Sequence, residues 1–161
     1  PRIPRSHLAG HAFQVLNRGN GGATVFHTDG DYRVFLELLA AAKATHPITI
    51  RAFCLRPNHF HLVLQPIRNA SLSPFMHWWM TSHVRRYHRY YRSHGPVRQG
   101  RFKRFPIQQD GHLFTVLRYV LLNPVRARLV EHADEWPWSS LQYPQLAAPI
   151  GLGHLATPAP F

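Results

Sequence analysis

The sequence is poor in cysteine and lacks long apolar runs, and each shortage excludes a class of protein. Cys54 is the only cysteine among 161 residues, so an internal disulfide and a cysteine-based zinc site are excluded. This rules out a disulfide-stapled secreted domain and favours a reducing compartment. No run of about 18 apolar residues occurs, which predicts that the chain has no membrane span. No apolar core follows the basic first residues, so we expect no secretory signal there.

Acidic residues are also scarce. The 7 Asp and Glu face 19 Lys and Arg, which gives a formal net charge of +12 with His neutral. All but Lys43 and Lys103 of these basic residues are Arg, and no acid occurs between Glu37 and Asp110. A guanidinium group matches phosphate with two hydrogen bonds, so this composition predicts a strongly positive face and a phosphate-rich partner. A hydrophobic content of 45% supports one folded domain with a sizeable core.

The spacing of apolar residues predicts alternating strands and helices of the α+β class. Strands are expected over residues 11–18, 48–55, 59–65 and 102–108, and helices over residues 31–45, 73–92 and 111–122. The first six elements match the ferredoxin-like split βαβ arrangement, an antiparallel sheet with helices on one face. The last helix carries Tyr119. We expect residues 1–141 to form one domain, and the Pro/Ala/Gly-rich residues 142–161 to form a loosely packed tail.

Local signals mark the helix starts and the strand faces. The expected helix caps are Asp29 or Asp31, then Ser73 followed by Pro74, and finally Asp110. Alternation in the strand at 48–55 predicts one face that holds Ile48, Ile50, Ala52 and Cys54.

Two histidines form the first candidate for chemistry. His59 and His61 lie two residues apart on an expected strand and therefore share a face, while Phe60 and Leu62 point to the core. Paired imidazoles suit a divalent metal that keeps open positions. The alternative is two ordinary surface histidines in a chain that holds 13.

A tyrosine and an asparagine form the second candidate. Tyr119 and Asn123 are four residues apart, so they lie on nearly one face of the last predicted helix. At the helix end, the amide oxygen of Asn123 is free to accept a hydrogen bond from water or to bind a cation. The alternative is a tyrosine at the rim of the core and an asparagine that caps the helix C-terminus.

Basic and aromatic residues interleave over residues 85–105. Eight Arg and Lys occur between positions 85 and 104, together with Tyr87, Tyr90, Tyr91 and Phe102. Guanidinium groups for phosphates and aromatic faces for unstacked bases are typical of single-stranded nucleic acid binding. A merely solvated charged face is the alternative, but the lack of any acid in the stretch favours binding.

Six strings in this sequence together resemble a known family. They are Asn17-Arg18-Gly19-Asn20, Asp31-Tyr32 with Phe35-Leu36, Arg56-Pro57-Asn58-His59-Phe60-His61-Leu62, Gln99-Gly100-Arg101-Phe102-Lys103, Tyr119-Val120-Leu121-Leu122-Asn123-Pro124-Val125-Arg126-Ala127 and Trp136-Pro137-Trp138-Ser139-Ser140. Their order and spacing resemble the REP-associated tyrosine transposases, a branch of the single-tyrosine HUH (IS200-like) transposases. The resemblance covers about residues 8–141.

The resemblance implies a metal-dependent single-stranded DNA endonuclease and strand transferase. By position, His59, His61 and Asn123 would hold Mg²⁺ or Mn²⁺, and Tyr119 would be the nucleophile that forms a 5′-phosphotyrosine. The implied partner is hairpin or repeat DNA, and the implied location is the bacterial cytoplasm, at the nucleoid when bound to DNA. The expected DNA contacts are Arg18, Asn20, Arg85, Arg86, Arg89, Arg98, Arg101, Lys103 and Arg104.

Two positions depart from the family pattern. Arg56 stands where Met is usual, and Arg98 stands where Trp is common. We expect neither to touch the proposed catalytic set, and we expect Arg98 to alter the DNA groove. The loop at Gly21-Gly22 is also less basic than usual.

Other functions and nucleophiles stay open on the sequence. The main alternative is a non-catalytic, domesticated protein that binds repetitive extragenic DNA, although the presence of every proposed catalytic residue favours an enzyme. An RNA-binding module is a third possibility, but no matching RNA-recognition string occurs. Tyr87, Tyr90 and Tyr91 are rival nucleophiles, ranked below Tyr119 because Asn123 lies one turn from it. The chain could act as a monomer or as a homodimer.

Overall fold

Four strands form one antiparallel sheet in the computed structural model, which describes residues 10–69, 71–108 and 111–147. The strands are β1 (Phe13–Arg18), β2 (Ile48–Arg56), β3 (His59–Pro66) and β4 (Lys103–Pro106). They lie in the order β2-β3-β1-β4, with β1 and β3 in the centre. This is the strand order of the ferredoxin-like arrangement, so the predicted α+β class and antiparallel sheet are confirmed.

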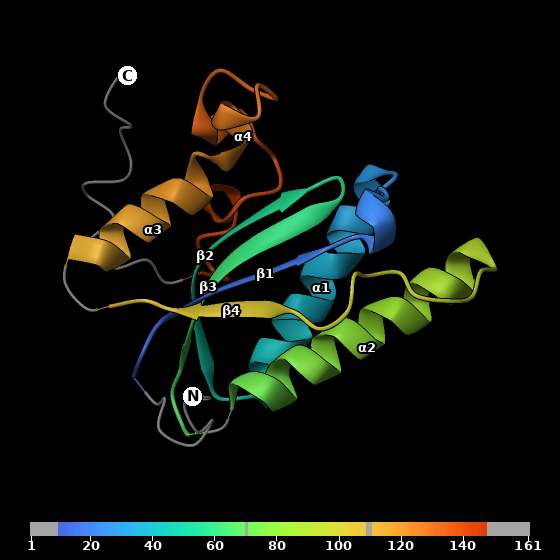
Figure 1. Cartoon of the computed structure of the whole chain (residues 1–161), viewed down its shortest axis with the longest axis horizontal. Helices are drawn as coiled ribbons and strands as arrows, with labels where there is room; N and C mark the ends of the chain where they lie inside the picture. Colours follow the sequence, from blue (N-terminus) through green and yellow to red (C-terminus); the bar gives the residue numbers. More distant parts are fainter. Residues whose placement is uncertain (1–9, 70, 109–110, 148–161) are drawn as a thin grey trace.

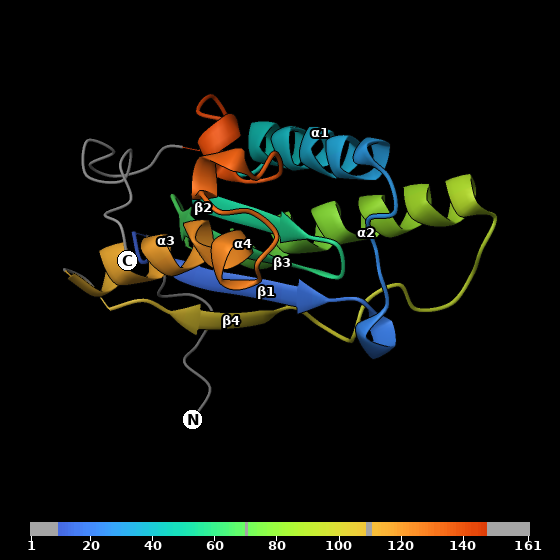
Figure 2. The ribbon, with the colours of Figure 1, turned by 90° about the horizontal axis from the view of Figure 1, so that it is seen from above.

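Helices cover both faces of the sheet (Figures 1 and 2). Helices α1 (Asp29–Thr45) and α2 (Leu72–Tyr91) pack on one face, where Phe35 and Trp79 meet Phe60. Helices α3 (Gly111–Leu121) and α4 (Asn123–Arg126) lie on the other face, where Leu117 packs with Val63. The prediction of helices on one face therefore holds for α1 and α2, whereas α3 covers the second face because that face is also apolar. No described helix is both long and apolar enough to cross a bilayer.

A bulge in β2 decides which of its residues reach each face. The pairing of β2 with β3 shifts register between Ile50 and Ala52. Ile50 therefore packs with the core under α1 and α2, while Ala52 and Cys54 pack against α3. One extra residue reverses the alternation, so the predicted single face of Ile48, Ile50, Ala52 and Cys54 is wrong. The same reversal places Arg56 on the face of Cys54.

The helix caps differ from those predicted. Thr28 caps α1: its Oγ1 accepts from the Asp31 backbone N–H at 3.3 Å, and Asp31 Oδ2 accepts from the Thr28 N–H at 3.1 Å. Asp31 therefore acts from the first turn, as the partner in a capping box. Ser71, not Ser73, precedes α2, and its hydroxyl donates to nearby backbone carbonyls rather than capping the helix. Asp110 lies outside the described residues.

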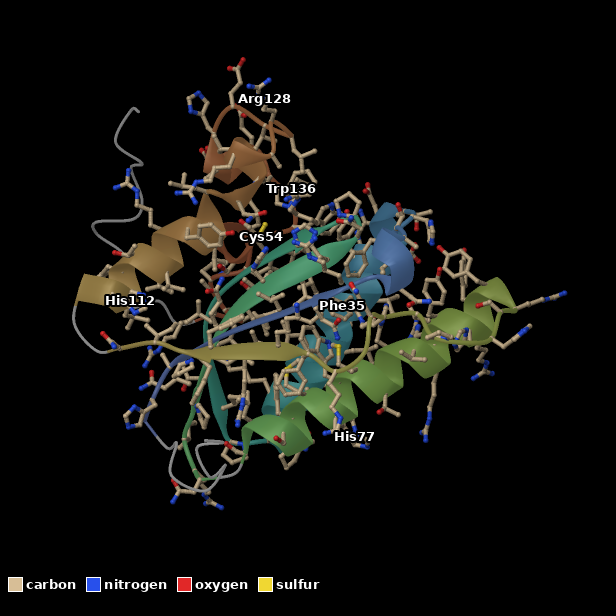
Figure 3. The ribbon with its side chains drawn as sticks, viewed as in Figure 1. Phe35, Cys54, His77, His112, Arg128 and Trp136 are labelled. Atoms are coloured by element: carbon tan, nitrogen blue, oxygen red, sulfur yellow. The ribbon has the colours of Figure 1, made fainter. Side chains whose placement is uncertain are left out.

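The segment after α4 covers the outer edge of β2. The Leu55 N–H donates to the Trp138 carbonyl at 2.8 Å, and the indole of Trp136 donates to the Leu55 carbonyl at 2.8 Å. Figure 3 shows Trp136 beside Cys54 on this side of the sheet. The packed chain continues past residue 141, because Lys43 of α1 donates to the Leu146 carbonyl at 2.9 Å. The expected loose tail therefore does not begin at 142, and residues 148–161 lie outside the described part.

Gly19 closes the loop between β1 and the short 3₁₀ helix η1 (Asn20–Gly22). A β carbon at Gly19 would lie 2.0 Å from the Ala23 carbonyl oxygen, a backbone atom that cannot give way. We expect Gly19→Ala to lower the free energy of unfolding by about 1–3 kcal/mol, as overpacking does. Urea denaturation measures this loss. Gly30→Ala is the matched control because its β carbon would make only an ordinary 3.5 Å contact with Thr28, and an equal loss in both variants would contradict the steric argument.

Candidate functional site

The two histidines lie on the sheet face covered by α3. His59 pairs with Arg18 of β1 on one side and with Arg56 of β2 on the other, so two arginines flank it. The side chains of His59 and His61 are each only 6% exposed, and their ring centroids are 5.1 Å apart. Phe60 points to the opposite face, as predicted. The alternative of two surface histidines is therefore excluded.

Both imidazoles are neutral at pH 7. Burial, followed by the electrostatic interaction with the His61 ring and by the positive charges of Arg56 and Arg18, lowers the pKa of His59 to about 4. Burial and the same two arginines lower the pKa of His61 to about 4. His59 Nδ1 donates to Asn58 Oδ1 at 2.7 Å, which leaves the lone pair on Nε2. The buried Nδ1 of His61 has no hydrogen-bond partner within the described chain. Neutral imidazoles with uncommitted lone pairs are ligands for divalent metals.

Helices α3 and α4 bring the tyrosine and the asparagine to the histidines. The ring of Tyr119 meets His61 edge to face, with centroids 5.8 Å apart and an interplanar angle of 89°. Tyr119 is 38% exposed, so its ring also faces solvent. Asn123 is buried and begins α4 instead of capping α3, and Pro124 follows at a position where a helix tolerates its missing N–H. Arg126 of α4 lies 4.9 Å above the ring centroid of Tyr119.

Arg56 belongs to this site, contrary to expectation. Its Nη1 donates to Asn123 Oδ1 at 3.2 Å, so the expectation that Arg56 stays away from the catalytic set is wrong. The physical reason is the bulge in β2, which turns Arg56 toward the face of His59. Asn58, which fixes the His59 tautomer, and Arg126 are also site residues that the sequence reasoning missed. The position of Asn58 beside His59 was the one local signal that pointed to it.

The donor set fits a divalent cation. Among the described residues, no three His, Cys, Asp or Glu side chains gather into a metal site. The amide oxygen of Asn123 is the candidate third ligand, because it accepts from Arg56, the cross-strand neighbour of His59. Imidazole nitrogen and amide oxygen are donors that Mn²⁺ and other first-row divalent ions accept, and oxygen donors suit Mg²⁺.

The rival tyrosines lie on the other face of the sheet. Tyr91 donates to Asp31 Oδ2 at 2.5 Å, and burial together with this hydrogen bond raises the pKa of Tyr91. The Tyr87 hydroxyl lies 2.9 Å from His27 Nε2, and Tyr90 is 72% exposed on the same helix. All three belong to α2, which packs on the face opposite the paired histidines.

The expected DNA contacts do not form one surface. Arg18 pairs with His59 across β1 and β3. Leu16 of β1 pairs with both His61 and Lys103, so Lys103 lies on the same face of the sheet as His61. Asn20 is exposed in η1. On the opposite face, the exposed arginines of α2 are Arg85, Arg86 and Arg89. Arg85 and Arg101 line a groove of about 620 Å³ between α2 and the loop that leads to β4, and Arg104 packs 5.9 Å from the ring centroid of Phe13.

Arg98 is buried, which corrects its expected role as a surface DNA contact. Its guanidinium carbon lies 5.0 Å from the ring centroids of both Phe35 and Phe60. Its Nη2 lies 3.2 Å from His83 Nδ1, and a backbone bridge to Gly19 holds the residue beside the end of β1. A planar guanidinium stacks on aromatic rings, so Arg98 fills the core much as the Trp expected from the resemblance would.

His83 makes the folded chain sensitive to acid. Burial, and then the charge of Arg98, lower its pKa from 6.5 to about 3. The unfolded chain takes up this proton near pH 6.5 whereas the folded chain does not, so stability falls as the pH drops below 6.5. A Gln side chain can still accept from Arg98 but does not titrate. Between pH 6 and 4, we expect His83→Gln to reduce the slope of the free energy of unfolding against pH by about 1.4 kcal/mol per pH unit.

Urea denaturation at several pH values measures this slope. The other histidines are the same in both proteins, so their contributions cancel in the comparison. Equal slopes for the parent and His83→Gln would show that His83 titrates normally in the folded chain.

Comparison with known proteins gives one consistent result. The family described as "Transposase IS200 like" matches residues 11–121. A Haemophilus influenzae protein that carries the name REP-associated tyrosine transposase is 31% identical to this chain over 118 residues. The matched region covers 65% of this chain and 66% of that protein, so the chain spans just under two thirds of the length of this relative. The solved structure of a REP-associated tyrosine transposase bound to a REP hairpin is similar in fold, with a TM-score of 0.72 at 18% identity over 88% of this chain and 82% of that one.

Proposed function

Because the chain belongs to the IS200-like transposase family, we propose that it nicks and rejoins single-stranded DNA through a covalent bond to Tyr119. One observation carries the proposal. Residues about 60 positions apart in the sequence converge, since the Tyr119 ring stands against His61 with centroids 5.8 Å apart and Asn123 follows one turn later. A partly exposed phenol beside two neutral imidazoles and an amide is an arrangement suited to phosphoryl transfer.

The chemistry assigned to the tyrosine is a direct displacement at phosphorus. Tyr119 Oη attacks the scissile phosphate, the bond from phosphorus to the 3′ oxygen breaks, and the phenol proton passes to that oxygen. The products are a 5′-phosphotyrosine and a free 3′-OH. The phosphodiester energy is kept in the new bond, so a 3′-OH can reverse the step and join strands. Arg126, 4.9 Å from the ring centroid, stabilises negative charge on the phenol oxygen as it develops.

The histidines and the asparagine are assigned to the metal. We propose that His59, His61 and Asn123 hold Mg²⁺ or Mn²⁺, which would supply Lewis-acid polarisation of the scissile phosphate when bound. Asn58 keeps the proton on His59 Nδ1 and so presents Nε2 as the ligand.

The proposed substrate is a DNA hairpin with an adjoining single strand. A relative of the same fold is bound to a REP hairpin, and the formal net charge of +12 in this chain favours a polyanion. We assign to Arg18 and Lys103, which lie on the histidine face, contacts with the phosphates next to the scissile bond. We propose the bacterial cytoplasm as the location of the protein, at the nucleoid when it is bound to DNA.

Incubation with a single-stranded hairpin oligonucleotide and Mn²⁺ tests the proposal. We expect a covalent protein–DNA adduct that survives a denaturing gel and contains Tyr119 by peptide mass analysis. Tight binding of the hairpin with no adduct in either Mg²⁺ or Mn²⁺ would instead support the non-catalytic, domesticated binding protein.

A further inference from the structure

We propose that Arg56 couples metal binding at the catalytic site to DNA binding, an inference that rests on the proposed function. Arg56 Nη1 donates to Asn123 Oδ1 at 3.2 Å, the oxygen assigned as the third metal ligand. The free protein therefore already holds one positive charge on the atom that a divalent cation needs.

The position of Arg56 is fixed by the sheet. Because of the β2 bulge and the pairing of Arg56 with His59, the Arg56 side chain lies on the same face of the sheet as the two histidines. Its Nε is buried and has no hydrogen-bond partner in the described part of the chain. A guanidinium and a divalent cation that share one amide oxygen repel each other in a partly buried site, where the charges are poorly screened. Arg56 therefore weakens metal binding as long as it stays on Asn123.

The scissile phosphate supplies a negative charge, which the free site lacks. The charged groups that bear on the two histidines from the neighbouring strands are Arg18 and Arg56, both positive. Phosphate oxygens accept two parallel hydrogen bonds from a guanidinium, so DNA next to Tyr119 offers Arg56 a stronger partner than the neutral amide. The phosphate also neutralises the repulsion between Arg56 and the cation. Metal and DNA therefore bind cooperatively, and each tightens the other by the same factor.

Mn²⁺ titration of the full chain tests this coupling. All proteins carry Tyr119→Phe, so that no strand is cut, and the electron paramagnetic resonance signal of free Mn²⁺ reports binding. We expect saturating single-stranded oligothymidine to tighten Mn²⁺ binding by about tenfold when Arg56 is present. Arg56→Met is expected to bind Mn²⁺ about tenfold tighter than its parent without DNA, and to gain less from the oligonucleotide than its parent does.

Two controls separate the coupling from other effects. Arg33→Met removes an exposed arginine that stacks on Trp138 on the α1 side of the sheet, so it should leave Mn²⁺ binding unchanged. Arg56→Gln removes the charge with a polar side chain and replaces Arg56→Met if that variant fails to fold. The coupling is overturned if the Arg56 variants bind Mn²⁺ and respond to DNA as their parent does.

The His61→Ala variant distinguishes the failure of this inference from the failure of the proposed function. If His61→Ala retains Mn²⁺ binding, the histidines do not hold the metal, and the proposed site fails together with the coupling. If His61→Ala loses Mn²⁺ while Arg56→Met matches its parent with and without DNA, the metal site stands and only the role of Arg56 is wrong.

Discussion

We expect Tyr119→Phe to abolish the covalent protein–DNA adduct while hairpin affinity stays unchanged. The substitution removes one oxygen from a side chain that is already 38% exposed, and it keeps the ring that packs against His61. Without a nucleophile no phosphotyrosine forms, so adduct formation should fall by about 10⁴-fold or more, as expected when a covalent catalyst is removed. Denaturing gels measure the adduct, and fluorescence anisotropy measures the affinity.

Tyr90→Phe is the matched control for this substitution. Tyr90 is the most exposed of the rival tyrosines and lies on α2, on the other face of the sheet, so its loss should leave adduct yield at the parent level. An undiminished adduct in Tyr119→Phe, or a lost adduct in Tyr90→Phe, would move the nucleophile to α2 and contradict the assignment.

Removal of one paired histidine should have the second-largest effect. We expect His59→Ala to reduce cleavage by about 100-fold or more, because losing a ligand and its oriented partner disrupts the proposed metal site. The fold should persist, since His59 faces away from the core beneath α1 and α2. Among the described residues, its neutral ring forms a hydrogen bond only with its neighbour Asn58. Cleavage rate, Mn²⁺ affinity and thermal unfolding together measure these effects.

His77→Ala is the corresponding control. His77 is exposed on α2, and Figure 3 shows it on the side of the molecule away from Cys54 and Trp136. Its loss should leave cleavage and Mn²⁺ affinity unchanged. If His59→Ala unfolds, or if it cuts DNA at the parent rate, the histidine pair is a structural feature rather than a metal site.

The sequence predicted the elements that carry the site with good accuracy. Alternation over residues 59–65 put His59 and His61 on one face and Phe60 on the other, and the structure has that arrangement. The four-residue spacing of Tyr119 and Asn123 also survives, although Asn123 starts α4 and does not end α3. These predictions hold because strand and helix periodicities are local properties of the backbone.

Predictions that depended on what surrounds a residue were less accurate. Arg98 was expected at the DNA surface, but its guanidinium lies between Phe35 and Phe60. One strongly positive face was expected, but the sheet separates Lys103 from the arginines of α2. Charge and spacing do not show which apolar residues will enclose a side chain, or which face of a sheet a helix will cover.

The sequence by itself determined the α+β order of elements, the shared face of the two histidines and the strong positive charge, because each follows from residue type and short-range period. Only the tertiary structure decided that α3 covers the histidine face and that Arg56 reaches Asn123. Helix α3 packs there because that face is apolar, and Arg56 reaches Asn123 because of the single extra residue in β2. A bulge reverses every later side chain of its strand, and it is fixed by pairing with a neighbouring strand and not by the pattern of the strand itself.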